Sequence, residues 1–137
     1  MRIDKIYIYT DGGSRGNPGS AAIGITLLDE QKSVLEQYRE CIGETTNNVA
    51  EYKAIIKALE IATAHTREEV YLFSDSELVI KQLSGSYRIK KGHLRELFYL
   101  IKEREKAFKK VIYSHLNREN KFIAMSDKLV NEALDNK

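Results

Sequence analysis

The sequence predicts an α/β fold in which a mixed sheet of five strands carries helices on both faces. Two observations predict it: short runs rich in β-branched and aromatic residues, and longer segments with apolar residues at helical spacing, in the order β-β-β-α-β-α-α-β-α. The chain has 137 residues, of which 42% are hydrophobic and 31% charged. This length and composition suit one globular unit with a buried core, so we expect a single domain over residues 1–137.

The first three strands are expected over residues 3–10, 21–28 and 33–42. A glycine-rich segment over residues 12–19 and a charged segment over residues 29–32 separate them. This pattern predicts an antiparallel meander, with the glycine-rich segment as a wide turn in which glycine supplies positive φ. That segment joins two strands and lacks the Gly-Lys-Ser/Thr ending of a P-loop, which argues against a nucleotide site of that class.

The rest of the chain alternates between helices and strands. In the first helical segment, Tyr52, Ile55, Ile56 and Leu59 recur at helical spacing. The last helix is expected to open at Asp127. The other expected elements are a helix over residues 47–64, a strand over 69–74, a short helix over 76–83, a helix over 93–107 and a strand over 110–115.

Four acidic residues lie where these elements begin or end. Asp11 and Asp75 each end a strand, next to apolar and aromatic residues on the same face. Glu51 borders the apolar stripe of its helix, and Asp127 starts the last one. Each acid alone has an ordinary explanation as a turn, first-turn or capping residue. The four together, in these settings, predict a shared site.

Such a site requires a cation. Two carboxylates ~4 Å apart repel each other by about 4 kcal/mol at an effective dielectric of 20. Mg²⁺ binds a few carboxylate oxygens and completes its shell with waters and phosphate oxygens, and Mn²⁺ is the alternative ion. The four acids therefore predict a divalent-metal site for phosphodiester chemistry.

The net charge of +2 is unevenly spread. Residues 1–70 hold 8 Lys/Arg against 11 Asp/Glu, a balance of −3, whereas residues 71–137 hold 14 against 9, a balance of +5. A polyanion would be drawn to the second half, and the basic cluster at residues 88–91 is the best contact candidate. The segment over residues 102–110 interleaves acids and is better explained as a solvated face.

The single cysteine, Cys41, excludes an intramolecular disulfide and lies in a strand-like run, which predicts a buried structural thiol. No apolar run approaches the ~20 residues needed to span a bilayer, and the charged start does not fit a signal peptide. We therefore expect a cytoplasmic protein without a membrane partner, acting as a monomer.

Nearly the whole chain resembles the type 1 ribonuclease H family. The string TDGGSRGNPG at residues 10–19 is similar to the family's first motif and is unusually specific. Further similar segments are TTNNVAEY at residues 45–52, SDS at 74–76, QLSGSY at 82–87 and DKLVNEA at 127–133. The short tract around residues 84–93 lacks a tryptophan-rich basic protrusion. We expect no separate hybrid-binding domain, so the chain resembles the compact archaeal-like branch.

The resemblance implies a ribonuclease H-like fold, with the last two strands parallel to the first. It also implies an endonuclease that cuts the RNA strand of RNA–DNA hybrids by two-metal-ion catalysis and leaves 5′-phosphate and 3′-hydroxyl ends. In that scheme Asp11 bridges the two metals, Glu51 and Asp75 hold one, and Asp127 holds the other. Glu51 would also sense the ribose 2′-hydroxyl. The compact form implies modest, salt-dependent binding and tolerance of RNA–RNA duplex.

The resemblance further suggests residues that contact the substrate. Instead of binding substrate, Thr46 and Asn47 could equally cap a helix, and Asn17 could equally form a turn. Family members often carry a loop histidine before the fourth acid, which here suggests a proton or phosphate role for His115, although residues 120–126 look longer than the usual family stretch. The resemblance places the family's DNA-phosphate pocket at Asn17, Thr46 and Asn47. Gly13 and Ser14, in the glycine-rich segment beside Asp11, are further candidates for substrate binding. Arg118 is another candidate, although a surface position is the ordinary explanation for an arginine.

Two other classes of function fit the same acids. A DNA nuclease of the same fold, such as a Holliday-junction resolvase, would gather its carboxylates in a similar way. A hybrid-binding protein that has lost catalysis would retain them as remnants. Metal binding that is lost on changing Asp11 to Asn separates an intact site from a remnant.

Overall fold

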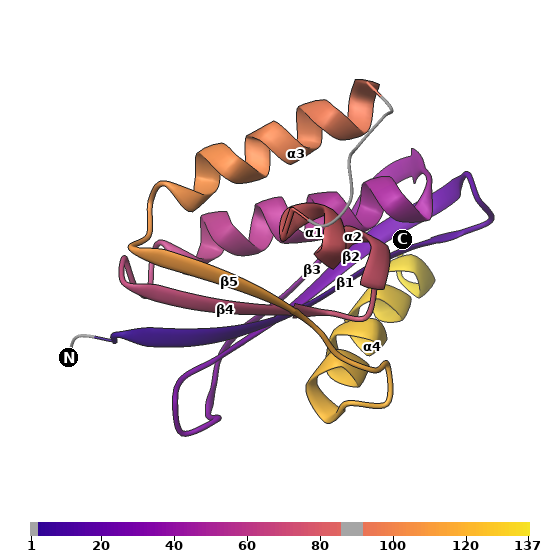
Figure 1. Ribbon diagram of the computed structural model, residues 1–137. Helices are drawn as coiled ribbons and strands as arrows, with labels where there is room; N and C mark the ends of the chain where they lie inside the picture. Colours follow the sequence, from indigo (N-terminus) through magenta and orange to yellow (C-terminus); the bar gives the residue numbers. More distant parts are fainter. Residues whose placement is uncertain (1–2, 86–91) are drawn as a thin grey trace.

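The computed structural model describes residues 3–85 and 92–137, and it contains the expected order of strands and helices (Figure 1). The predicted bounds of the fourth and fifth strands agree with those of the structure. The basic cluster at residues 88–91 lies outside the described residues. The elements are β1 (Lys5–Arg15), β2 (Gly19–Leu28), β3 (Val34–Thr45), α1 (Asn47–Ala62), β4 (Glu69–Ser74), α2 (Glu77–Leu83), α3 (Gly92–Glu105), β5 (Lys110–His115) and α4 (Lys121–Asp135).

The five strands form one sheet in the order β3-β2-β1-β4-β5. β1, β2 and β3 pair as an antiparallel meander, whereas β4 is parallel to both β1 and β5. The predicted five-stranded mixed sheet is therefore confirmed. The parallel pairing places Lys5–Tyr9 of β1 beside Glu69–Phe73 of β4.

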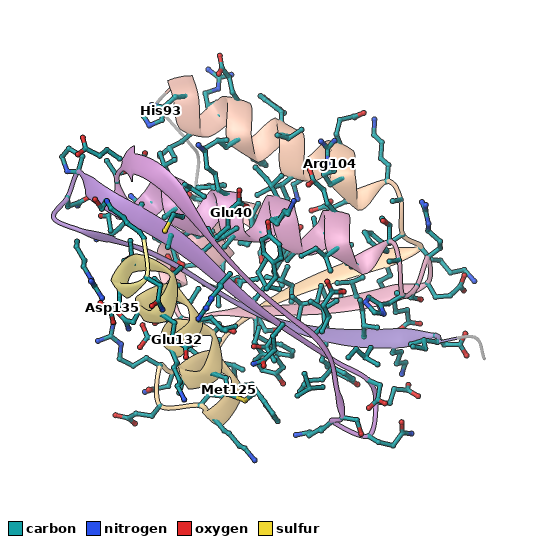
Figure 2. All side chains as sticks on the ribbon, turned by 180° about the vertical axis from the view of Figure 1, so that it is seen from behind. Glu40, His93, Arg104, Met125, Glu132 and Asp135 are labelled. Carbon is teal, nitrogen blue, oxygen red and sulfur yellow. The ribbon has the colours of Figure 1, made fainter. Side chains whose placement is uncertain are left out.

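Helices cover the sheet on both faces (Figure 1): α1 and α3 lie on one face and α4 on the other. Figure 2 shows this arrangement from behind, with Glu132 and Asp135 on α4 and Arg104 on α3. Alternation along β1 sends Ile8 into the larger core under α1 and Tyr9 toward α4. Within the described residues, no helix is both long and apolar enough to cross a membrane.

Two glycines allow the helices to contact the sheet directly. A Cβ at Gly12 of β1 would overlap the backbone of Ala50 in α1. A Cβ at Gly24 of β2 would overlap the backbone carbonyl of Ser126 in α4. The two helices therefore approach adjacent strands, from opposite faces, closer than any residue with a side chain would permit.

The wide glycine-rich turn predicted over residues 12–19 is wrong. β1 continues through Arg15, which pairs with Ser20, so the turn is confined to residues 16–18. Within that turn only Gly16 has a positive φ, of 94°. Gly12 is required for helix packing, and sequence alone does not distinguish this role from a role in a turn.

The last helix begins earlier than predicted. The side chain of Asn120 caps α4 by accepting hydrogen bonds from the backbone N–H groups of Phe122 and Ile123. Ile123 is buried against the sheet, so the packed face of the helix starts there. Asp127 consequently lies in the second turn of α4 and does not open the helix.

Cys41 is exposed, contrary to the prediction of a buried thiol. It lies on β3, which is an edge strand, next to a register irregularity between Ala21 and Ala22. Its Sγ is 3.1 Å from the backbone carbonyl oxygen of Ala133. An edge strand is covered on one side only, which a strand-like pattern in the sequence does not reveal.

We expect Gly24→Ala to lower the free energy of unfolding by about 2–3 kcal/mol, because the new methyl group must displace the backbone of α4. Denaturant unfolding measures this change. Gly92→Ala is the matched control, since a Cβ there meets nothing within 4 Å. A Gly24→Ala protein as stable as the control would contradict the close approach of α4.

Candidate active site

Two of the predicted acids meet where β1 and β4 stop pairing: Asp75 directly follows β4, whereas Asp11 lies within β1 and does not end its strand as the sequence predicted. The parallel register of these strands ends at the pair Tyr9 and Phe73, two residues before Asp11 and Asp75. Glu51 reaches the same point from α1. Ligand oxygens of these three acids all lie within 4.8 Å of one another.

Glu51 is held by the main chain of β1. Its side chain is buried, and its Oε1 accepts a hydrogen bond of 2.6 Å from the backbone N–H of Gly12. Burial raises the pKa of Glu51 well above its ordinary value, and the charges of Asp11 and Asp75 raise it further, whereas the Gly12 N–H opposes the shift. Gly12 thus allows α1 to approach and also orients the carboxylate that α1 carries.

Asp11 is buried in the middle of the cluster. Burial, followed by the nearby carboxyl groups of Asp75 and Asp127, raises the pKa of Asp11 from 3.8 to about 8. Asp127 itself is exposed on α4. It lies outside the tight group of three acids, but α4 packs on the face of the sheet that carries Asp11, and the side chains of Asp127 and Asp11 share a hydrogen bond.

The four acids line one cleft of about 390 Å³. Its donors are carboxylate oxygens, and two of the acids are buried, where unneutralised negative charge is unfavourable. Hard divalent cations bind such oxygen sets. The residues present therefore fit a divalent metal site.

The implied substrate-binding residues near the first hairpin also bond to one another. The Oδ1 of Asn47 accepts hydrogen bonds from the backbone N–H of Ser14 at 2.8 Å and from its hydroxyl at 3.1 Å. The Oδ1 of Asn17 accepts a bond from the backbone N–H of Asn47. Thr46 caps α1 through the N–H of Val49, at 3.2 Å. Gly13, Ser14 and Asn47 line the acid cleft, whereas Asn17 and Thr46 lie outside its lining.

Arg118 and His115 occupy different positions relative to the acids. Arg118 lines the cleft, with its Nε 3.8 Å from Oδ2 of Asp75 and its side chain 82% exposed. His115 ends β5, is exposed and does not line the cleft. Its charge helps to lower the pKa of Glu77, after the larger effect of Lys81. The structure thus brings the arginine, and not the histidine, beside the carboxylates.

Sequence reasoning missed several residues that line the cleft. Asn131 lies one helical turn after Asp127, and its Nδ2 donates a 3.2 Å hydrogen bond to the Asp127 carbonyl oxygen. The i, i+4 spacing on α4 was the available signal. The remaining missed residues of the lining are Gly12, Arg15, Asn48, Ser76, Val130 and Leu134.

Comparisons with known proteins agree with this geometry. Residues 9–133 match the family described as reverse transcriptase-like. A bifunctional protein of Mycobacterium tuberculosis is 36% identical over 96% of this chain, and the chain spans 36% of that protein's length. Ribonuclease HI of Halobacterium salinarum is 37% identical, and the chain spans 65% of its length.

Solved structures extend the similarity to three dimensions. Ribonuclease H1 of Halobacterium salinarum superimposes with a TM-score of 0.93 at 37% identity, covering 97% of this chain and 99% of the other. LC11 ribonuclease H1, isolated from compost and solved in complex with an RNA/DNA hybrid, gives a TM-score of 0.89 at 43% identity, covering 96% and 97%. The shared fold and the shared sequence lead to one conclusion: the chain belongs to the type 1 ribonuclease H family.

Proposed function

We propose that this chain is an endoribonuclease that hydrolyses the RNA strand of RNA–DNA hybrids and leaves 5′-phosphate and 3′-hydroxyl ends. The observation that carries the proposal is the convergence of Asp11, Glu51 and Asp75 in one cleft. The hybrid bound to the LC11 relative supports the substrate class. Residues 1–137 would act as a single catalytic domain and a cytoplasmic monomer.

The four acids would hold two divalent cations, Mg²⁺ in the first instance and Mn²⁺ as the alternative. Asp11 would contact both, Glu51 and Asp75 one, and Asp127 the other. Bound there, the cations supply the positive charge that favours in-line attack by water on the phosphorus and departure of the 3′-oxygen.

The chain's own groups position the substrate. The Gly12 N–H fixes Oε1 of Glu51, so its other oxygen is available to a cation or to a ribose 2′-hydroxyl. Arg118 beside Asp75 would bind a phosphate at the edge of the cleft. Asn17, Thr46 and Asn47 would bind a phosphate of the DNA strand, while the hydrogen bond from the Asn47 N–H to Oδ1 of Asn17 holds the hairpin against α1. We extend the proposal to cleavage of RNA–RNA duplex.

We expect Mg²⁺-dependent internal cuts in an end-labelled RNA paired to DNA, abolished by chelator and reduced ~10²-fold or more in Asp11→Asn. Glu30→Gln is the matched control, because it removes an exposed carboxylate outside the cleft. The same RNA paired to RNA measures the breadth of the substrate class. Cleavage of duplex DNA would identify a DNA nuclease instead, and hybrid binding without cutting would identify a recognition protein.

The pKa of Asp11, raised to about 8, predicts a pH dependence of stability in chelator. The pKa of Asp11 is higher in the folded state than in the unfolded state. Its contribution to the stability of the folded protein is therefore complete below about pH 4 and is lost as the pH rises through about 8. Asp11→Asn carries no such charge, so its melting temperature should rise relative to that of the wild type between about pH 4 and pH 8. If the melting temperatures of the two proteins changed with pH in parallel, the raised pKa of Asp11 would be refuted.

Arg118→Ala should raise KM for the hybrid and lower the salt dependence of binding by roughly one phosphate contact, because the side chain lines the cleft. His115→Ala is the comparison and should change KM less, since His115 lies outside the lining. Steady-state kinetics at several salt concentrations measure both. A larger defect in His115→Ala would show that the histidine takes this role.

A further inference from the structure

Ser126 joins α4 to the sheet immediately before Asp127. Its side chain is completely buried, and its hydroxyl donates a 2.7 Å hydrogen bond to the backbone carbonyl of Tyr9. It also lies 3.1 Å from the hydroxyl of Thr26, the register partner of Tyr9 on β2. The hydroxyl therefore sits over one pair of residues at the centre of the sheet.

The backbone of α4 meets the sheet at the same residue. The carbonyl oxygen of Ser126 lies where a Cβ of Gly24 would be, and Gly24 is the register partner of Asp11. Tyr9 precedes Asp11 by two residues on β1. Both contacts of Ser126 thus connect α4 to residues adjacent to Asp11.

The Ser126 hydroxyl bonds to a strand in preference to its own helix. A buried serine in a helix can bond to the carbonyl four residues earlier, and the Phe122 carbonyl lies 3.3 Å from the Ser126 hydroxyl. The Tyr9 carbonyl is closer, so the stronger bond crosses from the helix to the strand.

Asp127 has few side-chain contacts of its own. It is exposed, and the described contact of its carboxylate with Asn131 is 3.5 Å long. Its carboxyl group also hydrogen-bonds with that of Asp11, a bond that two ionised carboxylates cannot share because neither carries the proton. Glu51, by contrast, is buried and fixed by the Gly12 N–H. When both Asp11 and Asp127 are ionised, the placement of Asp127 depends on where α4 is anchored.

We propose that Ser126 is a positioning residue that sets the separation of Asp127 from Asp11 and so determines the affinity of the cation held by Asp127. The proposal rests on the proposed function only for its effect on cleavage. Metal binding by the free protein tests it independently. A structural role alone would lower stability without changing that affinity.

The test is Mn²⁺ titration by calorimetry of the full chain as the wild type, Ser126→Ala, Asp127→Asn and the double variant. The site that weakens in Asp127→Asn should also weaken roughly tenfold in Ser126→Ala. In the Asp127→Asn background, Ser126→Ala should cause no further loss of Mn²⁺ affinity, because the effects of two residues that act through one another do not add.

Two further variants serve as controls. Thr26→Val removes the neighbouring buried hydroxyl but not the bond to Tyr9, so it should leave Mn²⁺ affinity unchanged while lowering the melting temperature. Ser126→Cys keeps the side chain small with a weaker donor, and it should give an intermediate affinity if Ser126→Ala does not fold.

Three results would overturn the proposal. These are wild-type Mn²⁺ affinity in a destabilised Ser126→Ala, a full additional loss in the double variant, and no effect of Asp127→Asn on binding. A wild-type protein that binds Mn²⁺ and hybrid without cutting would refute the proposed function alone. The Mn²⁺ affinities of the four proteins would still test the role of Ser126, because they do not depend on catalysis.

Discussion

The close approach of two helices to adjacent strands from opposite faces is the constraint on which the site depends. Gly12 admits the backbone of α1 on one face, and Gly24 admits the backbone of α4 on the other. Because Gly24 pairs with Asp11, both approaches meet beside this carboxylate. Glu51 and Asp127, carried by the two helices, can therefore reach Asp11 in β1 and Asp75 directly after β4. A side chain at either glycine would move a helix and the acid that it carries.

Several acidic side chains lie close together at this point, and buried polar residues next to them in the sequence hold the surrounding backbone in place. Burial and mutual repulsion raise the pKa values of Asp11 and Glu51, so the cluster is unfavourable when ionised without a cation.

A buried hydroxyl residue adjoins each of the four acids in the sequence. The Thr10 hydroxyl donates to the Phe73 carbonyl at 3.3 Å, and the Tyr52 hydroxyl bonds to Gln82. Rigid placement before metal binding reduces the reorganisation that binding would otherwise require. These adjoining residues are Thr10, Tyr52, Ser74 and Ser126.

Much of the fold could be predicted because local pattern and tertiary packing agree over most of the chain. The β-branched and aromatic run of β4 and the apolar stripe of α1 correspond to elements with a buried face. The glycine-rich segment was misassigned because glycine serves equally in turns and at close backbone contacts. The start of α4 was misplaced because the prediction relied on Asp127, whereas the cap is Asn120. Cys41 was misjudged because a strand-like run does not reveal which strand lies at an edge.

The sequence by itself determined the fold class, the family and the identity of the four acids, because these depend on local composition, periodicity and motif strings that are readable along the chain. Only the tertiary structure decided which acids share a tight cluster, that Arg118 and not His115 lies beside them, and that Ser126 anchors α4 to Tyr9. The last contact joins residues 117 positions apart. Distances of this kind are set by how helices and strands pack, and packing depends on the whole chain at once.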